Sequence, residues 1–388
     1  MTKSAIAFTS FNDSETAGKE LGTQIKNKLT DYPVKVLIVF ASSSFDYDVL
    51  LASIKEITRP EILVGSSSAG EFISENFETD SACAIAIYSD EIKFSAGLAR
   101  GIQFDREPVA EKLFSYLQQK DSYQYQYHSA MIFADALSGY TDELIDLLTE
   151  KTVGEYQFFG GGAGDNANFM RTHVFFGDSS YTDSAVVLEM LSNKPIGVGV
   201  SHGWRPVSDK MRVTEANGRK LISLNGKPAL EIYKEFAKKT GQLLDEEQPV
   251  PFFLNNILGI EIAGGYKLRA PIAIIDDGAI CLASDIPVGV YASIMGSDSE
   301  STKTAAVDAT INALAQLGGL KPNVALFFDC VATRLRMGKE FDYQLEKVGE
   351  TLKGVGFAGC NTYGQVARVN GQFSGFQNCS AVVCIIPE

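Results

Sequence analysis

Three side chains with chemical potential lie close together in the segment GVGVSHGWRPVS, residues 197–208. His202 is one of only three histidines, and Trp204 is the only tryptophan. A neutral imidazole can bind haem iron, and a neighbouring indole can pack against the macrocycle. The Arg205 guanidinium can bind a carboxylate such as a propionate through two hydrogen bonds. The segment therefore predicts a pocket in which His202 is the metal ligand and Trp204 and Arg205 line the wall.

The same segment also has a purely structural interpretation. Alternating side chains from Val198 to Trp204 would lie on one face of a strand, and that face could be buried against protein alone. His202 would then bond to a backbone group, and Trp204 would fill the core. Both interpretations stay open at this point.

Other side chains compete with His202 for a metal ion. The remaining imidazoles are His128 and His173, and the thiolates of Cys330 and Cys360 are weaker candidates. The six cysteines form no C-x-x-C pair, and several lie in apolar runs, so we expect reduced, buried thiols.

Three glycine- or serine-rich corners form a second group of candidate sites. They are ILVGSSSAGEF (62–72), FFGGGAGDNA (158–167) and GFAGCNTYGQV (356–366). Such turns can expose backbone N–H groups and short hydroxyls to a carboxylate or a haem propionate. The predicted ligand-binding residues are Ser66, Ser67, Ser68, Gly162 and Gly164; plain structural turns are the alternative. Glu71, Asp165 and Gln365 are expected at matching places in the three corners, as part of a shared turn geometry.

Two enzyme motifs are incomplete in these corners. Residues 162–167 match G-x-G-x-x-A, but the strand-like NFMRTHVFF follows where a dinucleotide site needs a helix. Ser68 lacks the first glycine of a G-x-S-x-G nucleophile elbow, and no acid–histidine pair accompanies it. A hydrolase using Ser68 is therefore the weakest alternative, and we expect binding and signal transfer rather than turnover.

The elements that must position these residues come in three copies. Each copy is a strand, a helix, a short strand, a corner and a closing strand. The first strands are KVLIVFASSS (35–44), AMIFADALSG (130–139) and VALFFDCVAT (324–333), and the closing strands at 81–88, 184–191 and 380–386 all open with Ser-Ala. Crossover helices between parallel strands predict an α/β (or α+β) class, with mixed sheets, packed helices and the corners at sheet ends.

Length and charge restrict the remaining possibilities. A chain of 388 residues suits two domains. The net charge of −14, without a Lys/Arg run longer than two, excludes nucleic-acid and anionic-membrane binding as expected functions. No signal-peptide h-region and no apolar run of about 18 residues occurs, so we expect a soluble, cytoplasmic protein. Asn217-Gly218 and Asn225-Gly226 flank RKLISL and predict a hairpin, with a domain boundary near residue 226.

Taken together and in order, five segments resemble the FIST family of sensory modules. They are VGSSSAGEF (64–72), FFGGGAGDN (158–166), GVGVSHGWRPV (197–207), NGKPALEIYKE (225–235) and AGCNTYGQVARVNGQFSGFQNCSAVVCII (358–386). The resemblance implies a FIST N-like sensory domain at 1–226 and a FIST C-like domain at 227–388.

The resemblance also implies a function, which is signal input by small-ligand binding. The chain has no room for a kinase, cyclase or methyl-accepting segment, so it is similar to a stand-alone branch of haem-containing nitric oxide sensors that regulate a partner histidine kinase. That similarity implies haem as cofactor, and His202 is the iron ligand that the residues themselves favour. A haem-free sensor of amino-acid-like ligands is the alternative.

Overall fold

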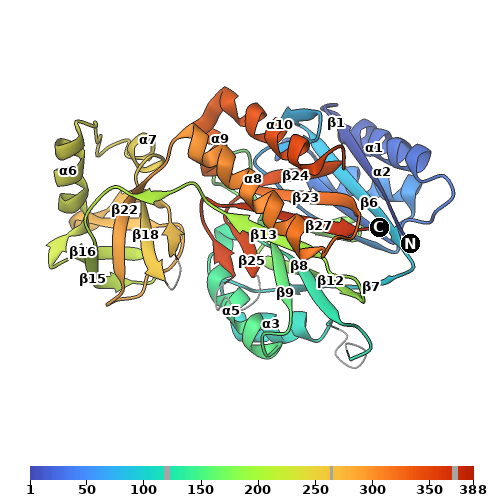
Figure 1. The fold of residues 1–388 in the computed structure, drawn as a ribbon, viewed down its shortest axis with the longest axis horizontal. Coiled ribbons are helices and arrows are strands. Elements are labelled where there is room, and N and C mark those ends of the chain that lie inside the picture. The colour runs from blue at the N-terminus through green and yellow to red at the C-terminus, as the bar shows by residue number, and fades with distance from the viewer. Residues whose placement is uncertain (118–122, 263–264, 369–374) are drawn as a thin grey trace.

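The chain folds into a large body and a small body (Figure 1). The computed structural model describes residues 1–117, 123–262, 265–368 and 375–388. The large body contains the three repeats. The small body is inserted between β13 (Gly197–Ser201) and α8 (Ser299–Gln316). The α/β class, the mixed sheets and the two-domain arrangement predicted from the repeats are confirmed.

Each repeat builds four neighbouring strands of one mixed sheet. In each of these three sheets one parallel pair, formed by the strands on either side of the crossover helix, is flanked by an antiparallel closing strand. In spatial order the strands are β1 (Thr2–Thr9), β6 (Ala82–Ser89), β2 (Val36–Ala41) and β3 (Ile62–Ser67); β7 (Ile92–Arg100), β12 (Ser184–Ser192), β8 (Tyr127–Ala134) and β9 (Gln157–Gly162); and β13, β27 (Ala381–Pro387), β23 (Pro322–Cys330) and β24 (Phe357–Thr362). The corners lie at the ends of β3, β9 and β24, as expected.

The segment after each corner does not return to its own sheet. Instead, it forms a hairpin that extends the sheet of another repeat, in a cycle through all three. The hairpin β4 (Glu71–Ile73) and β5 (Asn76–Glu78) joins β24; β10 (Val174–Phe176) and β11 (Ser179–Tyr181) join β3; β25 (Gln365–Arg368) and β26 (Phe376–Gln377) join β9. This exchange ties every repeat to the other two.

The register corrects one sequence expectation about the corners. Glu71 pairs with Cys360, and Gln365 pairs with Gly161, so these two residues do occupy matching places. In the second repeat the matching residue is Val174, which pairs with Ser66, and Asp165 lies in an extra loop. The Asp165 carboxylate accepts the backbone N–H groups that hold this loop, from Phe169, Met170 and Arg171.

Helices cover the outer face of each sheet, where their apolar faces form a separate core layer. The helices are α1 (Ser14–Lys28) and α2 (Tyr47–Thr58); α3 (Arg106–Phe114) and α5 (Thr141–Lys151); and α8, α9 (Val331–Met337) and α10 (Phe341–Leu352), with short 3-10 turns η1 (Ala136–Ser138) and η3 (Gly338–Glu340). Four of these helices, α1, α2, α3 and α8, begin after an aspartate whose side chain accepts a backbone N–H of the first turn.

The inner faces of the three sheets meet in one apolar core. One phenylalanine from each repeat lies at its centre, and each ring packs edge-on against both others, with centroid separations of 5.5 Å for Phe40 and Phe133 and 5.8 Å for the two pairs with Phe328. These residues hold the same register position, opposite Cys83, Val186 and Val382 of the closing strands. The core therefore has approximate threefold symmetry.

The corners also meet, and their backbones bond in a ring. The N–H of Gly164 donates to the Ser67 carbonyl (2.9 Å), that of Ala69 to the Asn361 carbonyl (2.9 Å), and that of Tyr363 to the Gly162 carbonyl (3.0 Å). Close approach requires glycine here, because a Cβ at Gly162 would lie 2.4 Å from the Tyr363 oxygen. The backbone N–H and carbonyl groups that an isolated corner would expose are therefore hydrogen-bonded to one another in this ring.

Glu71 is a fully buried carboxyl beside this ring. It accepts hydrogen bonds from the hydroxyls of Ser68 and Ser81. Burial raises the pKa of Glu71 to about 8, although the two hydroxyls and the charge of Arg334 oppose the rise. The first corner therefore holds a carboxyl group that is protonated over much of the neutral range.

As far as the structure describes it, the small body is a nine-stranded antiparallel assembly with two α-helices and one 3-10 turn. The predicted hairpin is confirmed, because β15 and β16 pair across Asn217-Gly218, where Gly218 has a φ of +54°. Its elements are β14 (Arg205–Pro206), β15 (Met211–Asn217), β16 (Lys220–Leu224), β17 (Lys227–Pro228), α6 (Ala229–Thr240), α7 (Val250–Phe253), β18 (Ile257–Ile262), β19 (Gly265–Arg269), β20 (Pro271–Ile275), η2 (Asp276–Gly278), β21 (Ala279–Leu282) and β22 (Tyr291–Gly296). The small body takes strands from both sides of residue 226, and the sequence division there stays a prediction.

No helix among the described residues has both the length and the apolar character to cross a membrane.

The central phenylalanine triad generates a stability prediction. Phe133→Ala removes a ring that is 1% exposed and contacts both partner rings, so we expect the protein to lose about 3–5 kcal/mol of unfolding free energy. Urea denaturation followed by circular dichroism measures the change. Phe104, which is 92% exposed, is the matched control, and Phe104→Ala should stay within about 0.5 kcal/mol. Equal losses in the two variants would contradict the central role of the triad.

Glu71 generates a pH prediction. The pKa of this carboxyl in the folded protein, about 8, exceeds its usual 4.5, so the folded state retains a proton that the unfolded chain releases. The stability contributed by neutral Glu71 is complete below pH 4.5 and is lost as the pH rises toward 8. We expect the urea midpoint to fall between about pH 5.5 and about pH 8.5, and to fall less in Glu71→Gln.

The exposed Glu75 provides the control for this measurement. Glu75→Gln should keep the pH dependence of the unchanged protein. A Glu71→Gln variant with that same dependence would show that the buried carboxyl does not titrate as described.

Candidate functional site

A cavity of about 440 Å³ lies between the two bodies. Its large-body wall comes from the carboxyl ends of β8 and β23 and from the third corner, and its small-body wall comes from α7, β20 and the segment after β21. Ligands of open α/β sheets bind outside the carboxyl ends of parallel strands, which is where this cavity lies. The position therefore combines a favourable sheet end with a second body that can close over it.

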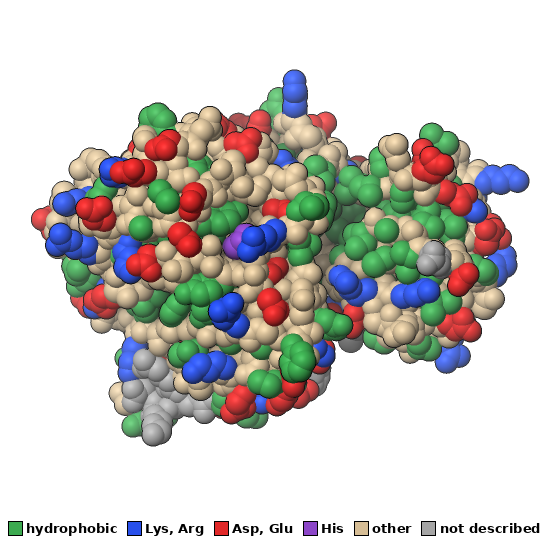
Figure 2. Space-filling view, turned by 180° about the vertical axis from the view of Figure 1, so that it is seen from behind, with side chains coloured by type: hydrophobic (Ala, Val, Ile, Leu, Met, Phe, Trp, Pro, Cys, Tyr) green, Lys and Arg blue, Asp and Glu red, His purple; other side chains and the backbone are tan. Residues whose placement is uncertain are grey.

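Most of the cavity wall is apolar. Leu137 and Leu335 project from the large body, and Val250, Leu254 and Ile272 from the small one. Figure 2 shows hydrophobic side chains gathered on both sides of the junction between the bodies. At the rim, Phe169 stacks on Tyr363 with ring centroids 4.6 Å apart. A cavity of this size and character suits a small organic molecule.

A buried ion-pair cluster joins the bodies at one side of the cavity. Asp142, in the first turn of α5, contacts Arg269 at 2.7 Å and Lys267 at 3.0 Å, both from β19 of the small body. The Arg269 side chain is 3% exposed. Burial lowers the pKa of both basic groups, while the Asp142 carboxylate counteracts that shift. Removing Asp142 would leave two cations in a poorly solvated place, so this cluster fixes the small body against α5.

Polar groups of opposite charge line the small-body wall. Partial burial and the nearby Asp142 carboxylate raise the pKa of Asp285, and the Arg219 guanidinium opposes the rise. Across the cavity, the large body contributes Glu143 and the buried amide of Asn378. The cavity can therefore offer an acceptor to an ammonium group, a guanidinium to a carboxylate and apolar surface to the rest of a ligand.

His202 lies where the chain first crosses from the large body to the small one, outside this cavity. The Trp204 backbone N–H donates to Nδ1 of His202 (3.3 Å), so Nε2 carries the ring proton and donates to the Tyr266 carbonyl (3.1 Å). Burial lowers the pKa of His202, which favours this neutral form. Both ring nitrogens are thus engaged, and the space beside the ring is about 10 Å³.

In this arrangement the segment fits neither a metal ion at His202 nor a macrocycle beside it. Haem ligation by His202 stays a prediction, and it would require the ring to release both hydrogen bonds.

Trp204 and Arg205 stabilise the two crossings between the bodies. Trp204, 8% exposed, packs among residues of both bodies, and the Arg336 guanidinium of α9 lies over its indole at 5.1 Å. Arg336 also donates to the Ser297 carbonyl of the second crossing (3.3 Å). The exposed Arg205 pairs with Asp298 of that crossing at 3.2 Å. The segment chosen from sequence is therefore part of a two-stranded connection between the bodies.

The predicted corner residues lie inside the large body. Ser66, Ser67 and Ser68 have no exposed surface, and Gly162 and Gly164 form the backbone ring. The Ser67 hydroxyl accepts the His173 N–H, the Ser68 hydroxyl donates to Glu71, and the Ser66 hydroxyl has no hydrogen-bond partner. In this arrangement these residues lie at the junction of the corners. Ligand binding by them stays a prediction.

The competing metal ligands are scattered. Nε2 of His128 bonds the Tyr125 carbonyl, and His173 packs against Tyr47 with ring centroids 5.0 Å apart. Cys360 is buried, and burial raises its pKa well above that of an ordinary thiol. Cys330 instead lines the cavity between the bodies. Across the parts of the chain that the structure describes, no group of three His, Cys, Asp or Glu side chains could hold a metal ion.

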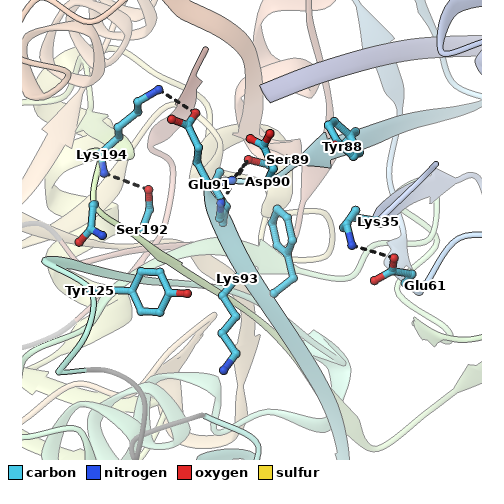
Figure 3. A pocket seen from close by; sticks show the side chains of 13 residues that line it. Lys35, Glu61, Tyr88, Ser89, Asp90, Glu91, Lys93, Tyr125, Ser192 and Lys194 are labelled. Atoms are coloured by element: carbon cyan, nitrogen blue, oxygen red, sulfur yellow. Dashed lines mark hydrogen bonds and ion pairs between the residues drawn. The ribbon is translucent and has the colours of Figure 1, made fainter. Parts of the chain in front are cut away.

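A second hollow, of about 860 Å³, lies at the amino ends of β2 and β3 (Figure 3). Its charges pair with one another: Lys35 contacts Glu61 at 2.9 Å, and Lys194 contacts Glu91 at 2.8 Å. It lies at the strand end opposite the corners and is open to solvent. The cavity between the bodies, with its apolar walls, is the better candidate for a ligand site.

Sequence reasoning missed the groups that matter most at this cavity. Asp142 stands in an amphipathic helix and Arg269 in a short strand, 127 residues apart. Neither belongs to a recognisable motif, so no signal in the sequence brings them together. Tyr363 and Cys330 lie in segments that the repeat pattern did single out.

Solved structures share only a weak overall likeness with the chain. A cyanuric acid hydrolase from A. caulinodans aligns over 100% of this chain and 99% of its own, with 8% identity and a TM-score of 0.34. PurL of T. maritima in complex with AMPPCP aligns over 99% of this chain and 72% of its own, with 12% identity and a TM-score of 0.23.

Relatives found by sequence share a higher identity with the chain than these structures do. An uncharacterized protein of Mycobacterium tuberculosis is 24% identical over 378 residues, which is 92% of this chain and 93% of the relative. An uncharacterized protein of Methanocaldococcus jannaschii is 23% identical over 314 residues, which is 75% of this chain, and this match spans 59% of the relative. The FIST N domain matches residues 35–227, and the FIST C domain matches residues 229–368. The chain therefore belongs to the FIST family, whose domains are sensory domains.

Proposed function

We propose that the protein is a ligand-binding sensor for signal transduction and that its ligand binds in the cavity between the two bodies. The sensory character of FIST domains supports the signalling role. The observation that carries the site is the cavity itself, at the carboxyl ends of β8 and β23 and closed by the small body.

The ligand class that fits this cavity best is an amino-acid-like molecule. Arg219 suits a carboxylate, Asp285 and Glu143 suit an ammonium group, and Leu137 and Val250 suit an apolar side chain. Such a ligand would touch both bodies at once. This combination favours the haem-free alternative among the sensor functions indicated by sequence.

Signal transfer would follow from that double contact. Only two stretches of chain connect the bodies, and Arg336 links them through Trp204 and Ser297. A ligand that binds both walls stabilises the arrangement in which both walls are in reach, so it shifts the population of relative orientations. A partner protein such as a histidine kinase, which the family resemblance implies, would respond to that orientation.

Binding without turnover is part of this proposal. Ser68, the one nucleophile that sequence suggested, is fully buried and bonded to Glu71 rather than to a histidine. A hydrolase acting through Ser68 would have to expose that hydroxyl and supply a base.

A cytoplasmic location is also proposed. All six cysteines are free thiols, which suits a reducing compartment, and the net charge of −14 gives no attraction to anionic lipid.

The ligand proposal predicts a titration result. Isothermal titration with the common amino acids and related carboxylates should identify a ligand, and Arg219→Ala should weaken its binding by about tenfold through loss of a charge-assisted hydrogen bond. Arg212, an exposed arginine of the same body outside the cavity, is the control, and Arg212→Ala should bind normally. Equal weakening in both variants, or no binding by any compound of the panel, would overturn the assignment.

The haem-based alternative has its own test, an absorption spectrum of protein from haem-sufficient cells and after reconstitution. We expect no Soret band that depends on His202, because both nitrogens of its ring are engaged. A Soret band that is lost in His202→Ala and kept in His128→Ala and His173→Ala would instead identify a haem sensor. A nitric oxide response of that band would then favour gas sensing.

A further inference from the structure

Two cysteines meet at the base of the cavity between the bodies. Cys330 ends β23, precedes the first residue of α9 and lines the cavity. Cys379 lies between β26 and β27, is 3% exposed and belongs to the same packed cluster. The two residues pack in this cluster because β23 and β27 are neighbouring strands, with Phe328 paired to Val382, although 48 residues separate the cysteines along the chain. A small molecule that enters the cavity reaches Cys330 first.

The surroundings make the two sulfurs unequal. Cys330 lines the cavity, whereas Cys379 lies behind it in the packed cluster. In agreement with that difference, the interaction with Cys379 lowers the pKa of Cys330, and the same interaction together with burial raises the pKa of Cys379. A thiolate is the nucleophilic form of cysteine. Because it lines the cavity, Cys330 is the sulfur in position to attack an entering molecule, and Cys379 lies beside it.

A second pair of cysteines in the chain shows the contrast. Cys83 and Cys360 lie in the apolar core of the large body, with no exposed surface and away from the cavity. Burial raises the pKa of both thiols well above the ordinary value. These two cysteines are therefore expected to be inert, which makes them an internal control.

We propose that Cys330 and Cys379 form a redox-responsive thiol pair that is oxidised to a disulfide by small hydroperoxides entering the cavity. This inference goes beyond the proposed function and does not depend on which organic ligand the cavity binds.

The reaction proceeds in two steps. The Cys330 thiolate attacks the terminal oxygen of the hydroperoxide, the O–O bond breaks, and the leaving alkoxide takes a proton to become an alcohol, or water when the oxidant is hydrogen peroxide. Cys330 is then a sulfenic acid. Cys379 attacks its sulfur, the S–O bond breaks, and the departing hydroxide takes the Cys379 proton to form water. Two thiols and one hydroperoxide become one disulfide, one alcohol and one water, and a dithiol reductant reverses the change.

Oxidation at this place reaches the connection between the bodies. The residue after Cys330 begins α9, and the same helix carries Arg336, which contacts Trp204 of the first crossing and Ser297 of the second. The cluster that holds both thiols also includes Trp204 and Met295. A change in the sulfur chemistry therefore acts on the packing that fixes the small body.

The primary test uses the unaltered protein and hydrogen peroxide. After exposure to a stoichiometric amount of peroxide, the protein is denatured and its free thiols are alkylated. Mass spectrometry then counts the alkylated cysteines and identifies any disulfide. We expect the count to fall from six to four, with a single Cys330–Cys379 disulfide that a dithiol reverses. Six remaining thiols, a disulfide between other cysteines, or Cys330 converted to sulfinic acid without a disulfide would each overturn the proposal.

Variants separate the roles of the two sulfurs. Cys379→Ser should leave a sulfenic acid at Cys330 that dimedone traps, and Cys330→Ser should leave Cys379 reduced. The register places Ser42 of the first repeat at the position of Cys330, so this fold already accommodates serine there. Cys83→Ser is the control and should form the disulfide normally. If Cys379 in Cys330→Ser were oxidised at the rate of the unaltered protein, Cys330 would not be the attacking thiol.

Discussion

The packing of Phe40, Phe133 and Phe328 at the centre of the large body is the constraint on which the remaining structure depends. Each repeat alone forms a sheet with helices on one face and nothing on the other. The uncovered face is apolar, and it is buried only when three such faces meet. The exchanged hairpins reinforce this, because each sheet is completed by strands from another repeat. The three repeats must therefore fold as one body.

Because the three repeats are approximately symmetric, residues that differ at equivalent positions point to differences in function. Ser42, Asp135 and Cys330 hold one register position in the three repeats, two residues after the central phenylalanines. The backbone requires little of the side chain there, so chemistry is free to differ. Asp135 accepts the Thr172 hydroxyl and supports the extra loop of the second corner. Cys330, in contrast, opens onto the cavity. Of these three residues, only Cys330 lines the cavity, so the repeat that faces the small body carries a thiol there.

Local patterns in the sequence predict the main strands and helices of the three repeats and one hairpin of the small body. Alternation and repeated Ser-Ala openings predict the closing strands, and Asn217-Gly218 predicts the hairpin, because each signal lies within a few neighbouring residues. The exchange of hairpins was not predictable, since strands such as β4 and β24 carry no mark that they pair. The hydrogen bond from Ser74 to Phe357 beside this pair already spans 283 positions of the chain. The matching of Asp165 with Glu71 failed for a similar reason, because an inserted loop preserves the local motif while it shifts the register.

The candidate site was predictable only in part, because the sequence does not show which polar groups the folded protein already uses in its own hydrogen bonds. Motifs directed attention to His202 and to the serines of the first corner, yet most of their polar groups are satisfied within the protein. Groups whose partners lie in the other body, such as Asp142 with Arg269, are spread over distant segments without a motif. A ligand gains most where the protein has left complementary groups on two surfaces that face each other. In this molecule those surfaces belong to different bodies, so a ligand that contacted both would couple its binding to the relative position of the bodies.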